Sequence, residues 1–144
     1  MTSERESREL TQVGPGTVMG DLMRRYWLPA ARSSELERDG APVRLMLLGE
    51  KLIAFRDSAG RVGVMDHRCP HRCASLFLGR NEEGGIRCIY HGWKYDVDGN
   101  CLDMPSVTPQ QEWVFLRNLE GRPQLVRWLG ARLVRAYLTF RTCS

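Results

Sequence analysis

The chain lacks any long hydrophobic run. No stretch of its 144 residues approaches the roughly 20 apolar residues that a membrane-spanning helix needs, although 42% of the residues are hydrophobic. The first ten residues, MTSERESREL, are polar and carry both signs of charge, so they do not form the apolar core of a secretory signal. Internal repeats and low-complexity tracts are also missing. These absences predict a cytoplasmic protein without a membrane partner, with an ordinary core.

A broad positive field is missing as well, although the net charge is +4. Residues 1–108 hold 15 basic and 15 acidic residues, whereas residues 109–144 hold six arginines, no lysine and two glutamates. The excess charge therefore belongs to the C-terminal segment. Because the rest of the chain is neutral overall, we expect no nucleic-acid partner.

Histidine is scarce, and the chain has only three. Two of them closely follow a cysteine: His71 lies two residues after Cys69, and His91 lies three residues after Cys88. Sixteen residues separate the two pairs. One thiolate and one imidazole from each of two loops are the ligands of a Rieske [2Fe-2S] centre, in which one iron takes both cysteines and the other both histidines. The pattern indicates a centre that handles single electrons.

Tetrahedral zinc is the competing interpretation, because zinc accepts the same four side chains. The chain would then be a structural or binding module without redox activity. A zinc finger, however, groups two cysteines before two histidines, so the interleaved order favours iron. The third histidine, His67, receives no metal role. Cys73 could be a reserve ligand or half of a disulfide, but we favour a small buried hydrophobic residue.

Two aromatic residues alternate directly after His91. Trp93 and Tyr95 could be plain core residues, but their position predicts a lid over the cluster, with the tyrosine hydroxyl free to bond a thiolate sulfur. We count both as cofactor-binding candidates beside the four metal ligands, and we expect no catalytic residue. The candidate site comprises Cys69, His71, Cys88, His91, Trp93 and Tyr95.

The local patterns predict an all-β fold, an antiparallel β sandwich with a cluster-binding subdomain and a short N-terminal helix. We expect residues 1–13 to be polar and frayed, and a helix capped by Thr17 to begin at Val18. A polar loop is expected over residues 33–40. Six β-type runs follow, at residues 42–49, 51–57, 61–66, 86–90, 93–97 and 100–104. Asp98-Gly99-Asn100 reads as a hairpin turn. Both Cys–His pairs are therefore expected at loop tips.

The stretch CPHRCASLFLGRNEEGGIRCIYHGWKYDVDGNCLDMPS, which begins at Cys69, resembles the Rieske domain of ring-hydroxylating and O-demethylating oxygenases. Within them it is most similar to the phthalate dioxygenase and vanillate demethylase type. The earlier segments MGDLMRRYWLPA and GEKLIAFRDSAGRVGVMD are similar to the same subunits. The resemblance implies a Rieske-type sandwich that binds one [2Fe-2S] cluster, with Cys69 and Cys88 on the inner iron and His71 and His91 on the outer iron.

The resemblance also implies partners. A reductase or ferredoxin would supply electrons, and the acceptor would be a mononuclear iron, usually in a neighbouring subunit, that activates O₂ on an aromatic acid. The resembled enzymes are commonly trimeric, so a homo-oligomer is expected. In the family two histidines and one carboxylate hold that iron. No histidine follows His91, so we expect the mononuclear Fe(II) site to be absent and this oxidoreductase component to lack a complete catalytic site.

Respiratory-chain Rieske proteins differ from this sequence. They add a cysteine to each ligand loop and place a serine after the His-Gly of the second loop. Here Tyr90 stands between the second-loop ligands, and Trp93 replaces that serine. Because a hydroxyl directed at sulfur is missing at this position, the resemblance predicts a reduction potential near the low end of the Rieske range, roughly −150 mV.

We divide the chain into a polar leader at residues 1–14, a Rieske domain at 15–108 and an arginine-rich tail at 109–144. Five tail residues could form one stripe of a basic amphipathic helix: Leu125, Leu129, Leu133, Tyr137 and Phe140. The loss of the family pattern after Pro105 favours a frameshifted or truncated reading frame instead. Under that interpretation the chain is an inactive remnant of an oxygenase.

Overall fold

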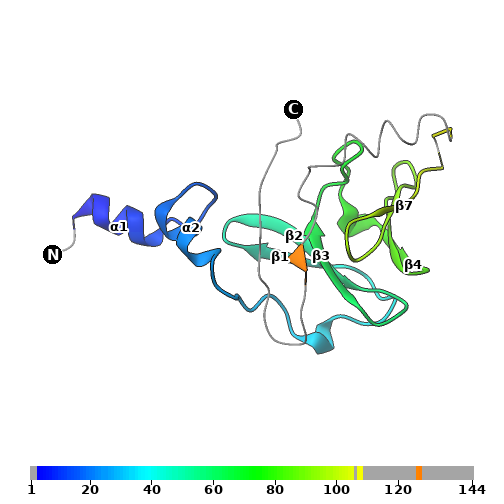
Figure 1. Cartoon of the computed structure of the whole chain (residues 1–144), viewed down its shortest axis with the longest axis horizontal. Helices are drawn as coiled ribbons and strands as arrows, with labels where there is room; N and C mark the ends of the chain where they lie inside the picture. The colour runs from blue at the N-terminus through cyan, green and yellow to red at the C-terminus, as the bar shows by residue number, and fades with distance from the viewer. Residues whose placement is uncertain (1–2, 106, 109–125, 128–144) are drawn as a thin grey trace.

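Two antiparallel sheets form the body of the protein (Figure 1). The computed structural model describes residues 3–105, 107–108 and 126–127, the last two by their backbone alone. The first sheet has the order β1-β2-β3-β8, with β1 (Val43–Leu47), β2 (Glu50–Arg56), β3 (Val62–Asp66) and β8 (Val126–Arg127). The predicted meander of three strands is confirmed. The fourth strand comes from the segment that we had set apart as a tail.

The second sheet has the order β4-β5-β6-β7. Its strands are β4 (Arg80–Glu82), β5 (Gly85–Arg87), β6 (Lys94–Tyr95) and β7 (Cys101–Asp103). The predicted run 86–90 is too long, because the chain leaves the ladder after Arg87 and turns at Cys88. The hairpin turn before β7 is confirmed: Gly99 has φ 79°, and Asp96 Oδ1 accepts the N–H groups of Asp98 and Asn100.

The N-terminal leader is helical, so the expectation of a frayed segment is wrong. Helix α1 (Glu4–Thr11) begins with a capping box in which Ser3 Oγ accepts the N–H of Glu6 and the Glu6 carboxylate accepts the N–H of Ser3. Two i,i+4 ion pairs, Arg5–Glu9 and Arg8–Glu4, support it. No residue of α1 is buried, so this helix depends on local interactions.

Helix α2 (Val18–Met23) lies where we expected it, and Thr17 Oγ1 accepts the N–H of Gly20 as its N-cap. Figure 1 shows both helices at one end of the molecule and the second sheet at the other. Neither of these helices, which are the α-helices of the described residues, is long and apolar enough to cross a membrane.

The loop at residues 33–40, which we expected to be polar, places one side chain in the core. It contains the 3₁₀ turn η1 (Ser33–Glu35), and the following Leu36 is buried. Leu36 joins Leu52, Ala54 and Val64 in the smaller of two core clusters. A second 3₁₀ turn, η2 (Leu76–Leu78), follows the first Cys–His pair.

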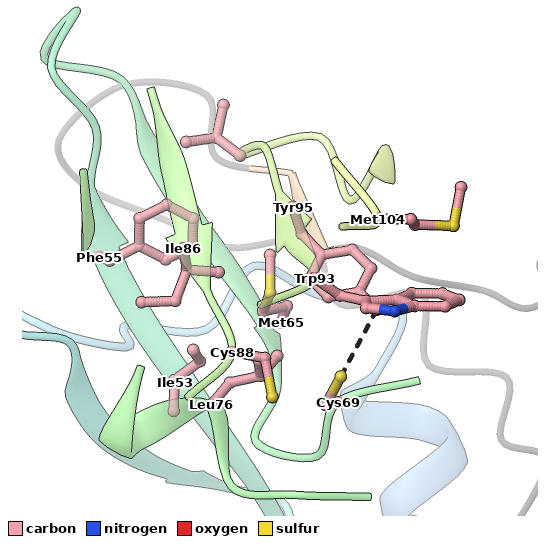
Figure 2. Close-up of a cluster of buried hydrophobic side chains, with 11 residues drawn as sticks. Ile53, Phe55, Met65, Cys69, Leu76, Ile86, Cys88, Trp93, Tyr95 and Met104 are labelled. Atoms are coloured by element: carbon pink, nitrogen blue, oxygen red, sulfur yellow. Dashed lines mark hydrogen bonds between the residues drawn. The ribbon is translucent and has the colours of Figure 1, made fainter. Parts of the chain in front are cut away.

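The larger core cluster contains both candidate cysteines (Figure 2). Strand β2 serves both clusters because successive residues point to opposite faces: Leu52 and Ala54 join the smaller one, and Ile53 and Phe55 the larger. The buried members of the larger cluster are Ile53, Phe55, Met65, Cys69, Leu76, Ile86, Cys88, Trp93, Tyr95, Val97 and Met104. The candidate metal ligands are thus partly built into the core that joins the sheets.

One buried amide ties the second sheet to the first. Asn81 on β4 donates through Nδ2 to the carbonyl of Arg56 at 2.7 Å and to that of Gly40 at 3.0 Å. We expect Asn81→Ala to lower the free energy of unfolding by about 1–3 kcal/mol, because both part-buried carbonyls lose the Asn81 donor. Urea denaturation measures this loss. Asn100→Ala, at an exposed turn, is the control, and equal losses in the two variants would contradict the role of Asn81.

Candidate metal centre

The first ligand loop, residues 69–74, follows β3. Its ends are closed by two backbone hydrogen bonds, from Cys69 N to Ala74 O at 2.7 Å and from Cys73 N to Cys69 O at 2.8 Å. Cys73 has φ 54°, in the left-handed region that a chain turning this sharply uses. The loop thereby returns on itself and presents His71 at its tip.

The second ligand loop, residues 88–93, connects β5 to β6 and has the same closure. Cys88 N donates to Trp93 O at 2.8 Å, and Gly92 N donates to Cys88 O at 3.0 Å. Gly92 has φ 74° at the position that corresponds to Cys73. Each loop therefore begins with a cysteine and carries its histidine near the tip, although the cysteine-to-histidine spacings differ by one residue.

The two thiols are buried. Cys69 is 1% exposed and Cys88 is 3% exposed, and Figure 2 shows their sulfur atoms at the same edge of the core. Burial raises the pKa of the Cys69 thiol, and the adjacent Cys88 raises it further, against the hydrogen bond with Tyr95. A metal that binds here must displace these protons, so its affinity falls as the pH falls.

The two imidazoles lie side by side at a less buried position. The ring centroids of His71 and His91 are 4.7 Å apart, and both side chains are half-buried. His71 stacks on Trp93 at 4.3 Å, and Tyr90 lies against His91 at 3.8 Å. Burial lowers the pKa of His71, and the neighbouring His91 lowers it further. Both effects favour the neutral imidazole that a metal requires.

The four side chains fit a two-iron cluster better than a single ion. Among the residues that the structure describes, no three His, Cys, Asp or Glu side chains converge closely enough to hold one metal ion. A structural zinc ion needs four ligands around one point. A Rieske cluster instead takes two thiolates at one iron and two imidazoles at the other, which matches the buried pair of sulfurs and the half-buried pair of rings.

Trp93 and Tyr95 belong to the core beneath the ligands. Each is 1% exposed, and the Tyr95 hydroxyl lies 3.5 Å from Cys69 Sγ. Burial raises the pKa of Tyr95, so the hydroxyl keeps its proton and can donate a hydrogen bond to a thiolate. The predicted contact between hydroxyl and sulfur is present. Both aromatic residues are members of the larger core cluster, and their role as a lid over the cluster stays a prediction.

Cys73 is not the small buried hydrophobic residue that we favoured. Its side chain is half-buried, and it takes part in a disulfide. His67, which received no metal role, lies with its Nδ1 3.1 Å from the carbonyl oxygen of Lys51, which accepts the ring N–H.

Arg87 is the residue at this site that sequence reasoning missed. It precedes Cys88, and its Nη1 donates to the carbonyl of Gly92 at 2.7 Å. The same guanidinium binds Glu82 and Asp103, and the bond with Asp103 raises the pKa of Arg87. Its partners come from three different parts of the chain, so no local pattern could have identified them.

Comparison with known proteins agrees with this geometry. The model of the Rieske [2Fe-2S] domain matches residues 26–120. The 3-chlorobenzoate-3,4-dioxygenase oxygenase subunit of Comamonas testosteroni is 61% identical over 113 residues, which are 78% of this chain and 26% of that protein. The phthalate 4,5-dioxygenase oxygenase subunit of Pseudomonas putida is 53% identical over 74% of this chain and 24% of that protein.

A third relative aligns over nearly the whole chain. The 5,5'-dehydrodivanillate O-demethylase oxygenase subunit of Sphingobium sp. is 47% identical over 142 residues, 96% of this chain and 32% of that protein. The chain thus spans about a quarter to a third of these relatives. Among solved structures, the QL mutant of NdmA from Pseudomonas putida CBB5 with theobromine has a TM-score of 0.59 and 26% identity over 80% of this chain and 35% of that chain. The chain belongs to the Rieske [2Fe-2S] domain family and is related to the oxygenase subunits of dioxygenases and O-demethylases, as its motifs predicted.

Proposed function

We propose that this chain binds one Rieske [2Fe-2S] cluster and relays single electrons from a reductase or ferredoxin to a mononuclear-iron oxygenase centre. Cys69 and Cys88 would hold the inner iron, and His71 and His91 the outer iron. One observation carries the proposal: two loops of the same geometry place two buried thiols together and hold two imidazole rings 4.7 Å apart.

When bound, the cluster supplies reversible transfer of one electron. The chain's own residues provide its surroundings. The larger core cluster keeps water from the thiols, and the Tyr95 hydroxyl, 3.5 Å from Cys69 Sγ, would donate a hydrogen bond to the Cys69 thiolate. The half-buried rings of His71 and His91 give the site its contact with solvent or a partner. This asymmetry, with sulfur inside and nitrogen outside, suits a relay that exchanges electrons at its imidazole end.

We assign the oxygenase centre to another subunit or domain than the one described. A mononuclear site of the family type needs two histidines and a carboxylate. This sequence has three histidines, and two are proposed as cluster ligands. By their names, the relatives act on 3-chlorobenzoate, phthalate and 5,5'-dehydrodivanillate. We therefore infer aromatic oxidation or O-demethylation by a neighbouring subunit or domain, in a cytoplasmic, oligomeric assembly.

Metal analysis of the full chain tests the proposal. After anaerobic reconstitution with iron and sulfide, we expect a red-brown protein with about two iron atoms and two sulfides per chain. Zinc is offered in a parallel reconstitution. A colourless protein that binds one zinc ion and no cluster would instead support the structural-module alternative. Insoluble, cluster-free protein would support the inactive remnant.

The reduction potential provides a second test. We expect a midpoint near the low end of the Rieske range, roughly −150 mV, in a redox titration monitored by visible absorbance. Trp93 occupies the position where the respiratory type has a serine hydroxyl. A clearly positive midpoint would contradict the assignment to the oxygenase type.

Tyr95→Phe should lower that potential further. The hydroxyl lies 3.5 Å from Cys69 Sγ and stabilises the extra negative charge of the reduced state. Its removal should shift the midpoint down by about 60 mV, which is tenfold in the equilibrium constant for one electron. Tyr90→Phe is the control, because Tyr90 is exposed and contacts the ring of His91. Equal shifts in both variants would exclude a special role for Tyr95.

A further inference from the structure

We propose that Arg87 is a positioning residue for the second ligand loop and sets the orientation of His91. The proposal rests on the proposed function, because it concerns a ligand of the cluster. Arg87 itself binds no metal. It holds the carbonyl of Gly92, the residue that follows His91, and it is held in turn by carboxylates on two other strands.

The Arg87 guanidinium is surrounded by three acceptors from different segments of the chain. Arg87 lies on β5, and its side chain is 19% exposed. Nη1 lies 2.7 Å from the carbonyl oxygen of Gly92 and 2.7 Å from Asp103 Oδ2, and Nε lies 2.9 Å from Glu82 Oε1. The partners stand on β4, on β7 and in the ligand loop. A planar guanidinium can satisfy all three acceptors at once and is thereby fixed in place.

Gly92 is the position in the second ligand loop that the Arg87 bond restrains. Gly92 directly follows His91 and has φ 74°, and a Cβ there would lie 3.2 Å from Pro105 Cγ. Glycine has the greatest backbone freedom of any residue. The loop's own closure runs from Gly92 N to Cys88 O. The bond from Arg87 adds a tether from outside the loop, and it restrains the Gly92–Trp93 peptide plane, one residue beyond the metal-binding histidine.

Arg80 provides a matched control within the same sheet. Its Nε lies 3.5 Å from Glu82 Oε2, so it shares a carboxylate partner with Arg87. Its side chain is 72% exposed, and exposed ion pairs of this kind contribute little to stability. Arg80→Met therefore removes the same charge from the same strand pair without removing the tether to Gly92.

The test compares Arg87→Met, Arg87→Lys, Arg80→Met and the wild-type chain after reconstitution. The readouts are the rate of cluster loss to a chelator, the reduction potential, and the imidazole nitrogen couplings in pulsed EPR. We expect Arg87→Met to lose its cluster about 10-fold faster or more, the usual effect of removing a group that supports a ligand. Its nitrogen couplings should change for one imidazole only, and Arg80→Met should match the wild type.

Arg87→Lys separates position from charge. Lysine keeps the positive charge but cannot reach three acceptors. The reduction potential of Arg87→Lys should therefore lie closer to the wild-type value than its nitrogen couplings do. An Arg87→Lys chain that matches the wild type in every readout would overturn the positioning role. So would an Arg87→Met protein that matches Arg80→Met.

Circular dichroism of each variant without cluster checks its folding. If Arg87→Met does not fold, Asp103→Asn takes its place, because it leaves Arg87 present but less firmly held. It should shift the couplings in the same direction by a smaller amount, and unchanged couplings would overturn the proposal. A wild-type chain that binds no cluster would refute the proposed function instead. The two failures are therefore distinguishable.

Discussion

Cys88→Ser is expected to abolish the cluster while leaving the fold in place. Cys88 is 3% exposed within the larger core cluster, and serine is nearly the same size. Its hydroxyl does not ionise at neutral pH and is a harder ligand than thiolate, so it does not replace sulfur at an iron–sulfur centre. Removing a supporting group already costs 10–100-fold in metal affinity, so loss of a ligand should leave below about a tenth of the wild-type cluster.

Iron content and visible absorbance after reconstitution measure this effect, and thermal unfolding of the cluster-free protein checks the fold. Cys101→Ser is the matched control. Cys101 is also a cysteine, but it is half-buried on β7 and donates weakly to the carbonyl of Asp103. It should keep the full cluster. A full cluster in Cys88→Ser would contradict the ligand assignment.

Arg24→Met is expected to cause the largest loss of stability. Arg24 follows α2, and its guanidinium pairs with Glu50 at the start of β2. The two side chains are 11% and 3% exposed. Arg24 also donates to the carbonyls of Val13 and Leu48, so it joins the helical end to the hairpin of β1 and β2. Breaking a buried pair leaves an uncompensated charge, which costs roughly 3–5 kcal/mol.

Chemical denaturation at neutral pH measures this loss. Arg8→Met is the control, because Arg8 pairs with Glu4 on the exposed surface of α1 and should change stability little. Glu50→Gln added to Arg24→Met should restore much of the loss, since the unpaired charge disappears. A loss no larger than that of Arg8→Met would contradict the role of the pair.

The same pair predicts a pH dependence. Burial raises the pKa of Glu50 above its ordinary value of 4.5, against the bond with Arg24. The folded state therefore binds the proton of the Glu50 carboxyl group more tightly than the unfolded state does. The stability that this proton contributes is complete below pH 4.5 and is lost as the pH rises through the folded pKa of Glu50. The deficit of Arg24→Met should accordingly shrink on acidification, and Glu50→Gln should remove that change.

The sequence predicted the parts of the fold that local pattern determines. The meander of β1, β2 and β3 follows from alternating apolar residues between turns, and the turn at Asp98-Gly99-Asn100 follows from its residue types. Strand β4 was missed because Arg-Asn-Glu has little tendency to form strand. These residues are extended because they pair with β5. Helix α1 was missed although Ser3 and Glu6 stand at capping-box spacing.

The ligand positions could be predicted, but their supports could not. Cys69, His71, Cys88 and His91 are recognisable by spacing because each pair lies within one short loop. The tether from Arg87 to Gly92 depends on carboxylates at residues 82 and 103, which only the second sheet brings together. Support from distant strands leaves no periodic signature in a single sequence.

The arginine-rich segment deserves a different interpretation from a frameshift. A frameshift after residue 108 predicts no family likeness beyond that point. The family match reaches residue 120, and the alignment with the demethylase subunit covers 96% of the chain. Val126–Arg127 also pairs with β3 as a fourth strand. From these observations we propose a domain that continues past residue 108 in place of a frameshift.

Pulsed EPR of the reduced, reconstituted full chain tests the central claim most directly. The account predicts a Rieske-type signal with couplings to two imidazole nitrogens, one from His71 and one from His91, because each ring would bind the outer iron. His71→Ala and His91→Ala should each remove one coupling or the signal itself. A [2Fe-2S] signal without nitrogen couplings, or a protein that binds zinc and gives no signal, would contradict it.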